Sequence, residues 1–363
     1  MKIESIEIRN YRLFRDTRIT HIPRLCVLVG ANGTGKSTLF DVFSFLKDAL
    51  TMNVSNAIAR RGGMREVMSR DQHKPICVEM KFRESGGRLV TYELQIDEHD
   101  GKVLVEREVL KCRRGQRGQP WRFVDFSRGA GTAIINEADY ARQDAREQRA
   151  DYALDKPDVL AIKGLGQFKE FRVVAEFRGL IENWRILDIH IDDMRPSTEE
   201  GFSEHMSTRG DNLAQVAHYL YTHHRERFEK VLEAMKHRVP GVSHVEAKPT
   251  EEGKLLLRIQ DGSFKDPFIA RHVSDGTMKM FAYLILLNDP QPFPLLAIEE
   301  PENQLYPELL GVLAEEFREY ADRGGQVFVS SHSPDFLNAL KLEEIYCLCK
   351  ERGFTTIKRA SDS

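Results

Sequence analysis

The sequence lacks any long hydrophobic run. No apolar stretch approaches the roughly twenty residues that a membrane-spanning helix needs, and the N-terminal segment MKIESIEIRN lacks the hydrophobic centre of a signal peptide. We therefore expect a cytoplasmic protein that makes no use of a membrane.

Cysteine and net charge are also scarce. The five cysteines among 363 residues are scattered, mostly in apolar, strand-like contexts, which favours reduced and mostly buried thiols. A formal net charge of -3 gives no global attraction to nucleic acid or anionic lipid, so such contacts would need local basic patches. The length is enough for one large or two ordinary domains.

A phosphate-binding loop is present at residues 27–38, which read VLVGANGTGKST and match G-x-x-x-x-G-K-[ST] at every position. An apolar run at 26–29 predicts a buried parallel strand before the loop, and residues 37–46 have helical periodicity after it. Glycines let backbone amides face a polyphosphate, and the helix N-terminus adds its positive end. A glycine-rich turn without a ligand is the alternative, which the intact motif and its flanks disfavour. The predicted nucleotide-binding residues of the loop are Gly30, Asn32, Gly33, Thr34, Gly35, Lys36, Ser37 and Thr38.

The chain is predicted to have three parts. Residues 1–126 combine the loop with alternating, strand-rich segments that are typical of antiparallel sheet. Residues 127–240 are charge-dense at first and amphipathic later, which predicts an inserted, mainly helical lobe that presents a partner surface. Residues 241–363 return to strands and carry further motifs. The sequence has no heptad seam and no internal repeat.

Acidic residues follow a late apolar strand in PFPLLAIEEPENQLYP. Residues 295–298 form the predicted strand, and Glu299 and Glu300 stand at its end, where a phosphate-loop ATPase places its metal and water ligands. We expect Glu299 to reach the Mg²⁺ shell and Glu300 to orient the attacking water. In QVFVSSHSPDFLN, a second strand delivers His332, whose imidazole can bind the γ-phosphate and the catalytic carboxylate.

A Ser-x-Gly turn opens an apolar helix in HVSDGTMKMFAYLILL. Its amides, at Ser274 and Gly276, form another anion site at a helix N-terminus. Taken singly, this turn and His332 are more simply interpreted as a helix cap and a strand end.

Four motifs in this order, GANGTGKST, VSDGT, AIEEPENQLYP and SSHSP, resemble those of ATP-binding-cassette (ABC) ATPases. The group includes the structural-maintenance-of-chromosomes (SMC) proteins, RecF, and the overcoming-lysogenization-defect (OLD) nucleases. The segments IRNYRLFRD and GDNLAQV bring the chain nearest to the RecF-like and OLD-like ATPases. The resemblance implies an α/β ABC-ATPase head, with a mixed and parallel sheet carrying the phosphate loop, an antiparallel β subdomain and an inserted helical lobe.

The same resemblance implies a site shared by two protomers that close on ATP and Mg²⁺ as a homodimer or a higher assembly. Ser274 and Gly276 of one protomer then cap the γ-phosphate held by Lys36 of the other. Glu300, His332 and Lys36 are the implied catalytic residues, and Ser37 and Glu299 the implied metal ligands. Arg12, on the first strand pair, is implied to approach the nucleotide.

Three features depart from the wider pattern. Glu299 stands where most of the superfamily has aspartate, which we interpret as a trait of the OLD-like branch, and SDGT is not the transporter signature LSGGQ. The glutamine that senses Mg²⁺ is not identified; Gln72 is a candidate, although a surface-loop role is the simpler one. About thirty residues follow His332, too few for a nuclease domain, so we expect any effector to be a separate polypeptide.

Two other groups of residues could carry chemistry. Asp188, His190 and Asp192 would lie on one face of a strand, either as metal ligands or, more simply, as a solvated face. Basic runs at 111–123 and 59–65 could contact a phosphate backbone, with a solvated hairpin tip as the alternative.

Three functional hypotheses follow from these motifs. The chain is expected to be an ATPase that dimerises on ATP and regulates or scaffolds a separately encoded effector, in prokaryotic anti-phage defence. A RecF-like DNA-binding repair ATPase is the alternative, and a transporter subunit is the weakest interpretation because its signature is absent.

Replacing Lys36 tests the phosphate loop directly. Lys36→Ala removes the charge directed at the phosphates and should abolish tight ATP binding, while the fold stays intact because Lys36 lies on a loop. Titration calorimetry measures the affinity, with circular dichroism as the control for folding. Wild-type affinity in this variant would contradict the assignment.

Overall fold

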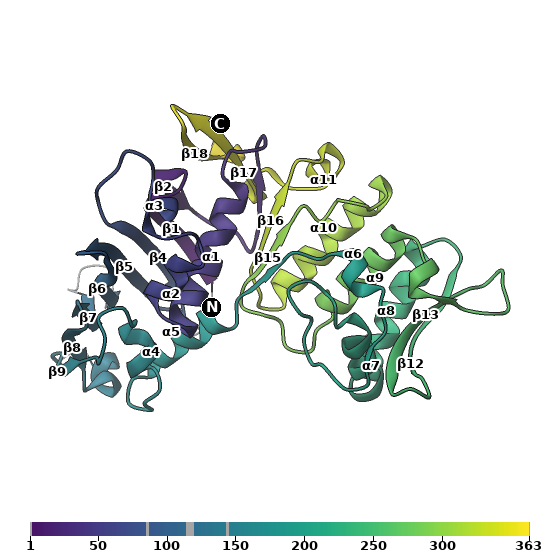
Figure 1. Ribbon diagram of the computed structural model, residues 1–363, viewed down its shortest axis with the longest axis horizontal. Coiled ribbons are helices and arrows are strands. Elements are labelled where there is room, and N and C mark those ends of the chain that lie inside the picture. Colours follow the sequence, from purple (N-terminus) through teal and green to yellow (C-terminus); the bar gives the residue numbers. More distant parts are fainter. Residues whose placement is uncertain (1, 85–86, 114–119, 143–144, 363) are drawn as a thin grey trace. The chain divides into compact units, whose positions relative to one another are not determined.

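The computed structural model describes residues 2–84, 87–113, 120–142 and 145–362. The chain divides into two compact units, and each is described by itself. The first unit contains Met1–Trp184 and Leu342–Ser363, and the second contains Arg185–Lys341. Both ends of the chain therefore belong to the first unit (Figure 1). No helix in the described ranges is long and apolar enough to cross a membrane.

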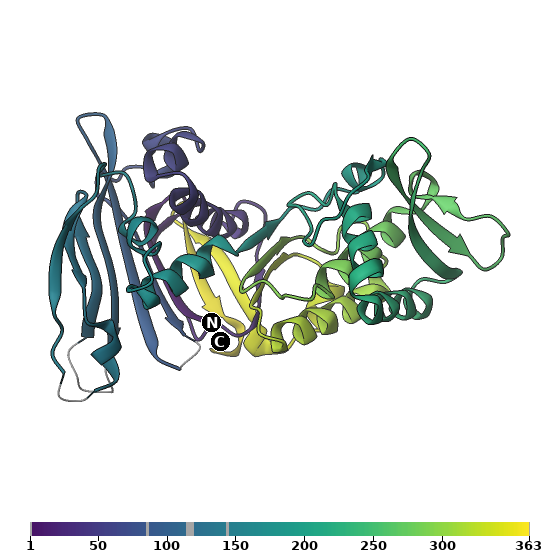
Figure 2. The ribbon, with the colours of Figure 1, turned by 90° about the horizontal axis from the view of Figure 1, so that it is seen from below.

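An antiparallel sheet of eight strands dominates the first unit, in the order β2-β1-β4-β5-β6-β7-β8-β9 (Figures 1 and 2). The strands are β1 (Lys2–Tyr11), β2 (Phe14–Thr20), β4 (Ile76–Arg83), β5 (Leu89–His99), β6 (Lys102–Arg113), β7 (Pro120–Ser127), β8 (Ala130–Ile134) and β9 (Arg149–Ala153). Alternating residues are buried along β4 and β5, as expected for a sheet with one face against a core.

Helices cover the buried face of this sheet. They are α1 (Lys36–Thr51), α2 (Val54–Ala59), α3 (Met64–Val67), α4 (Ala161–Leu165) and α5 (Arg172–Glu182). Phe177 of α5 contacts the rings of Phe82 and Tyr92, each at 4.6 Å between centroids. Phe43 of α1 packs edge-on against Trp184 at 5.4 Å. These aromatic contacts join α5 to the sheet and α1 to the residues that follow α5, within one core.

A second, mixed set of strands in the first unit carries the phosphate loop. β3 (Leu25–Val29) pairs in parallel with β17 (Ile345–Glu351), which pairs antiparallel with β18 (Phe354–Arg359). Four of the five β3 residues are buried, which agrees with the apolar run that precedes the loop. The C-terminal hairpin therefore belongs beside the loop at the start of the chain.

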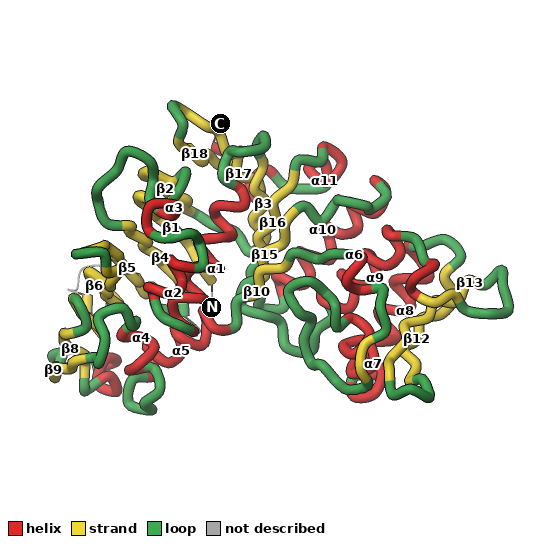
Figure 3. Tube along the Cα trace, viewed as in Figure 1, coloured by secondary structure: helices red, strands yellow, loops and turns green. Residues whose placement is uncertain are grey.

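The second unit is built from a parallel set of strands and a smaller antiparallel sheet (Figure 3). The parallel strands are β10 (Arg185–Leu187), β15 (Leu296–Glu299) and β16 (Val327–Ser331), and the antiparallel ones β11 (Thr198–Glu199), β12 (Val242–Pro249), β13 (Lys254–Asp261) and β14 (Phe268–Ile269). The helices are α6 (Ile191–Met194), α7 (Leu213–His223), α8 (Arg225–Arg238), α9 (Asp275–Leu287), α10 (Pro307–Asp322) and α11 (Pro334–Asn338). Ten of the thirteen residues of α9 are buried, so this helix lies at the centre of the unit.

The predicted three-part division does not coincide with these units. Residues 130–134 and 149–153 form β8 and β9, which continue the antiparallel sheet beyond the expected boundary at 127. Helices α4 and α5 belong to the first unit, and the helices from α6 onward belong to the second. Charge-dense composition hid β9, whereas β8, with the sequence AGTAI, is short and rich in the small residues that strands use least, so only pairing within the sheet defines both.

Glu108 of β6 is a buried carboxylate in the first unit, only 1 % exposed. It accepts hydrogen bonds from the backbone N–H groups of Ala161 and Ile162 and from the Tyr92 hydroxyl, at 3.0 Å for the last. Burial outweighs these bonds and raises the pKa of Glu108 to about 7. The carboxyl group thus ties the start of α4 to the centre of the sheet.

The raised pKa predicts a pH dependence of stability. Between the ordinary value of 4.5 and about 7, the folded chain keeps the Glu108 proton that the unfolded chain releases. The contribution of Glu108 to stability is therefore greatest below pH 4.5, falls as pH rises to about 7, and is level above it, a loss of roughly 3 kcal/mol. Denaturant unfolding of wild type and Glu108→Gln at several pH values measures this, and the difference between the curves should lose that slope. In Glu108→Gln, the side-chain NH2 group replaces one acceptor oxygen and faces a backbone N–H donor, which lowers stability at every pH. The pH slope is therefore diagnostic, and the absolute stability is not. A slope shared by both proteins would contradict the assignment.

Candidate nucleotide-binding and hydrolysis site

The predicted site residues fall into two groups. Arg12 and the phosphate-loop residues belong to the first unit, whereas Ser274, Gly276, Glu299, Glu300 and His332 belong to the second.

The C-terminal hairpin of β17 and β18 packs closely against the phosphate loop. A Cβ added at Gly30 would lie 2.6 Å from the Leu348 carbonyl oxygen, and one at Gly35 would lie 2.7 Å from the Thr355 hydroxyl. Gly35 also has a φ of 104°, which only glycine adopts readily. The Thr355 hydroxyl donates to the Thr34 carbonyl oxygen at 2.7 Å. The backbone of the loop therefore has little freedom, as a preformed anion site requires.

Lys36 is the first residue of α1 and is buried, so the expectation that it lies on a loop is wrong. Its side chain donates to the carbonyl oxygens of Gly30 at 2.7 Å and Ala31 at 3.4 Å. Lys36 and Thr38 are buried, while Asn32, Gly33 and Ser37 are exposed on the outer side of the turn. The ammonium group and the exposed Ser37 hydroxyl are thus presented on the first turn of α1, where the helix dipole favours an anion.

Arg12 is linked to the loop helix through Asp41. Its guanidinium lies 3.0 Å from Asp41, which also binds Arg61 at 2.8 Å and the Tyr11 hydroxyl at 2.6 Å. The backbone of Arg12 is in the left-handed region at φ 46°. Its side chain is about one-third exposed, so it remains accessible to a ligand.

Glu300 and His332 meet at the carboxyl ends of β15 and β16. The Nδ1 atom of His332 lies 3.3 Å from Oε1 of Glu300, and Asn303 Nδ2 donates to Oε2 of Glu300 at 3.0 Å. Glu300 has a φ of 43° and its backbone N–H donates to the Ser330 carbonyl oxygen at 2.9 Å. The sequence prediction that these two side chains lie together therefore agrees with the geometry.

Glu302 supports this pair from beneath. It is 8 % exposed, and its Oε1 atom accepts from the Ser331 hydroxyl at 2.7 Å and from the His332 backbone N–H at 3.0 Å. A single buried carboxylate thereby fixes the backbone that carries the histidine. The third glutamate of EEPE thus has a positioning role in the strand-end loop.

Lys279 connects α9, the helix that begins at the Ser-x-Gly turn, to the same loop. Its ammonium group is buried and donates to the Asn303 carbonyl oxygen at 2.7 Å. Burial lowers the pKa of Lys279, and the nearby carboxylates Glu302, Asp188 and Glu300 oppose that effect. A chain of contacts therefore runs from α9 through Lys279 and Asn303 to Glu300.

The N-terminus of α9 is exposed. The Ser274 hydroxyl accepts from the Thr277 backbone N–H at 3.3 Å, as an N-cap does. A Cβ at Gly276 would lie 3.1 Å from the Gln304 carbonyl oxygen. Arg195 braces the preceding turn by binding the carbonyl oxygens of Ala270 and Val273 at 2.6 and 2.9 Å and the Asp275 carboxylate.

Oxygen ligands for Mg²⁺ are present in both groups. Ser37 offers an exposed hydroxyl, and Glu299 ends β15 opposite Ser330. A hydroxyl and a carboxylate are the donor types that this cation prefers. The residues therefore fit a phosphate-bound magnesium ion.

The predicted metal grouping at Asp188, His190 and Asp192 is not supported. β10 ends at Leu187, and His190 precedes the short helix α6, so the three do not share a strand face. Asp188 and His190 form an exposed pair at 2.9 Å. Within the described residues, no group of three histidine, cysteine or carboxylate side chains could hold a metal ion.

The basic runs offer less to nucleic acid than their composition indicates. Trp121 is 6 % exposed and packs against Tyr140, and Arg122 pairs with Asp125 at 2.7 Å. Arg61 is buried between Asp41 and Asp48. Arg114 and Arg117 lie outside the described residues. Gln72 is half-buried in the loop after α3.

Sequence reasoning missed several supporting residues. Thr355, Asp41, Arg195 and Lys279 belong to no motif used in the prediction, and Asn303 lies within AIEEPENQLYP but was given no role. EEPEN does place Glu302 and Asn303 close to the catalytic pair, which is a usable signal. The others act across long separations that no local pattern shows.

Comparison with known proteins agrees with this geometry. Residues 25–338 match a family described as "AAA domain, putative AbiEii toxin, Type IV TA system". The chain belongs to this family of AAA-domain ATPases.

The chain is similar to one curated relative and, among solved structures, to two SMC heads. The "DNA double-strand break repair Rad50 ATPase" of Halobacterium salinarum is 22% identical over 238 residues, which cover 60% of this chain and 26% of that protein. The chain thus spans about a quarter of the relative's length. An SMC head bound to the C-winged helix domain of ScpA has a TM-score of 0.57 at 13% identity, covering 99% of this chain and 97% of that one.

An SMC head with an extended coiled coil, bound to the C-terminal domain of ScpA derived from Pyrococcus furiosus, has a TM-score of 0.53 at 12% identity. It covers 98% of this chain and 96% of that one. At these identities the likeness concerns the fold. The predicted ABC-type head, with its mixed sheet and antiparallel β subdomain, is confirmed.

Proposed function

We propose that the family member is an ATP-hydrolysing switch. It closes on Mg-ATP as a homodimer, or an assembly of dimers, and regulates or scaffolds a separately encoded effector in anti-phage defence. The observation that carries the hydrolytic part is the Glu300 carboxylate, held between His332 at 3.3 Å and Asn303 at 3.0 Å.

In this proposal the residues of the chain divide the reaction between them. Lys36 and the loop amides bind the β- and γ-phosphates, and Glu300 accepts a hydrogen bond from the attacking water and orients it. His332 bridges Glu300 and the γ-phosphate. Magnesium, when bound by Ser37 and Glu299, supplies positive charge that neutralises the phosphate oxygens.

The exposed N-terminus of α9 supports the dimer. Ser274 and Asp275 are both exposed, whereas ten of the thirteen residues of the helix that they begin are buried. The resemblance to ABC ATPases assigns this turn to the γ-phosphate of a partner protomer, and its N-terminal amides suit an anion.

A separate protein as partner is supported in two ways. The family description names a putative toxin of a type IV toxin–antitoxin system, and both SMC heads are described with a bound domain of a different protein, ScpA. The RecF-like alternative is favoured by one observation, the similarity to a relative named for DNA double-strand break repair. The burial of Trp121 and Arg61 removes two of the residues that would have contacted DNA.

Glu300→Gln tests the switch. The variant keeps the shape of the side chain but loses the charge that orients the water, so hydrolysis should fall about a hundredfold or more. ATP still binds, and relief of negative charge near the γ-phosphate favours closure. Light scattering with Mg-ATP should show a stable dimer or a multiple of it.

Ser274→Arg in the Glu300→Gln background is the matched test of the shared site. Arginine at the exposed turn should block closure, and the mass should return to that of the free chain. An undisturbed ATP-driven dimer, or an unchanged mass for Glu300→Gln alone, would leave the shared site unsupported. Duplex DNA added to the same sample separates the two candidate functions, since tight, salt-sensitive binding would favour the alternative.

Lys279→Met tests the connection from α9 to Glu300. Removing the hydrogen bond to Asn303 frees the loop that orients the carboxylate, so kcat should fall about tenfold, the effect of one lost hydrogen bond. The KM for ATP should stay unchanged, because Lys36 and its loop keep their contacts.

Lys230→Met, at an exposed position of α8, is the control for loss of a lysine. If Lys279 acts through Asn303, the double variant with Asn303→Ala should lose less activity than the two single effects combined. Additive losses, or a change confined to KM, would show that Lys279 has only a structural role.

A further inference from the structure

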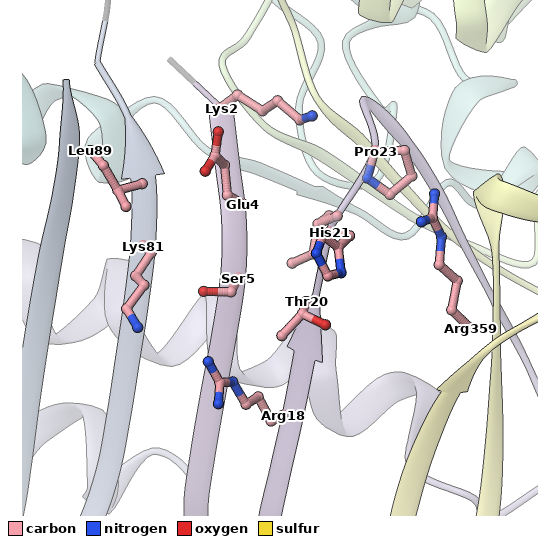
Figure 4. Close-up of a pocket in the computed structure, with 11 residues that line it drawn as sticks. Lys2, Glu4, Ser5, Arg18, Thr20, His21, Pro23, Lys81, Leu89 and Arg359 are labelled. Atoms are coloured by element: carbon pink, nitrogen blue, oxygen red, sulfur yellow. The ribbon is translucent and has the colours of Figure 1, made fainter. Parts of the chain in front are cut away.

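A cavity lies in the first unit, on the strands β1, β2 and β4 and beside β18 (Figure 4). Its volume is about 590 Å³, within the range of sites that enclose small ligands. The turn at His21–Pro23 lines it and precedes β3, whereas the phosphate loop follows β3. The two sites are therefore separated by the length of a five-residue strand, roughly 17 Å.

Positive charge dominates the lining of this cavity. Lys2, Arg18, Lys81 and Arg359 line it together with a single carboxylate, Glu4. Figure 4 shows these cations coming from four different strands around the opening. Because they are far apart in sequence, the fold has brought them together.

Two of these cations, Lys2 and Arg18, are incompletely neutralised. Glu4 is engaged by Arg83, a further cation, at 2.7 Å. Lys2 has no ion pair within the part of the chain that the structure describes, and Arg18 reaches Glu7 only at 4.0 Å.

Lys81, in contrast, has an ion pair with Glu79 at 3.1 Å. Burial lowers the pKa of Lys2; Glu4 opposes this, and Arg24, Arg359 and Arg83 lower it further. The surroundings of Lys2 are therefore electropositive, and an anion placed there would relieve the repulsion.

Two hydroxyl groups complete the lining. Ser5 of β1 lies opposite Thr20 of β2 on one side and Lys81 of β4 on the other. Neither hydroxyl makes a hydrogen bond with any described residue, so both are available as donors. Hydroxyls beside guanidinium and ammonium groups are the donor set that binds phosphate oxygens.

We propose that this cavity binds a small, multiply phosphorylated anion at a site separate from the phosphate loop. Four cations around one carboxylate call for several negative charges in a small volume, which a polyphosphate supplies and a single acidic side chain does not. The site does not depend on ATP hydrolysis or on dimerisation.

The experiment is calorimetric titration of tripolyphosphate into Lys36→Ala, in which the phosphate loop has lost its lysine. A single binding site for tripolyphosphate should remain, and its affinity should fall as the salt concentration rises. In the Lys36→Ala background, Lys2→Gln with Arg18→Gln should weaken binding at least tenfold, whereas Lys74→Gln with Lys102→Gln, both exposed and outside the cavity, should leave it unchanged.

Arg18→Gln alone is the control for misfolding, because the Arg18 side chain is 59% exposed. This single substitution should by itself lower the affinity. No binding by Lys36→Ala, or equal losses in the cavity pair and the surface pair, would overturn the proposal. Equally tight binding of citrate would also overturn it, because the site would then accept any polyanion.

Discussion

The close approach of the C-terminal hairpin to the phosphate loop is the constraint on which nucleotide binding depends. The carbonyl oxygen of Leu348 leaves no room for a side chain at Gly30, and the Thr355 hydroxyl holds Thr34. Thr17 in turn donates to the Thr355 carbonyl oxygen at 2.9 Å. Loop, hairpin and antiparallel sheet are therefore rigidly connected, so the anion site is formed before any ligand arrives, and binding has little ordering entropy to overcome.

Buried charges organise the second unit in a comparable way. Glu302 and Lys279 are both shielded from solvent, and each binds backbone of the loop or strand end that presents Glu300 and His332. A buried charge is costly unless its hydrogen bonds are satisfied. This cost means that displaced arrangements of the loop are penalised, which favours one geometry for the catalytic pair.

The sequence predicted those parts of the site that local chemistry determines. The glycine spacing, the acidic strand end and the serine cap each need particular residues at short separation, and all lie on the expected elements. Thr355 and Lys279 could not be predicted, because their roles come from contacts across 321 and 24 residues. The strands β8 and β9 were missed for a related reason: each is five residues long, and only the pairing of β8 with β7 and of β9 with β8 reveals them.

The two groups of site residues are each complete within one unit. Lys36 and its loop make their contacts inside the first unit, and Glu300, His332, Asn303 and Lys279 contact one another inside the second. In the proposed mechanism, affinity for ATP is therefore set by one unit and the orientation of water by the other. ATP held by the loop of one protomer is then capped by Ser274 and Gly276 of its partner, so ATP supplies the free energy that couples the two protomers. A nucleotide that holds two protomers together is what the proposed switch requires, since hydrolysis removes the γ-phosphate that both protomers bind.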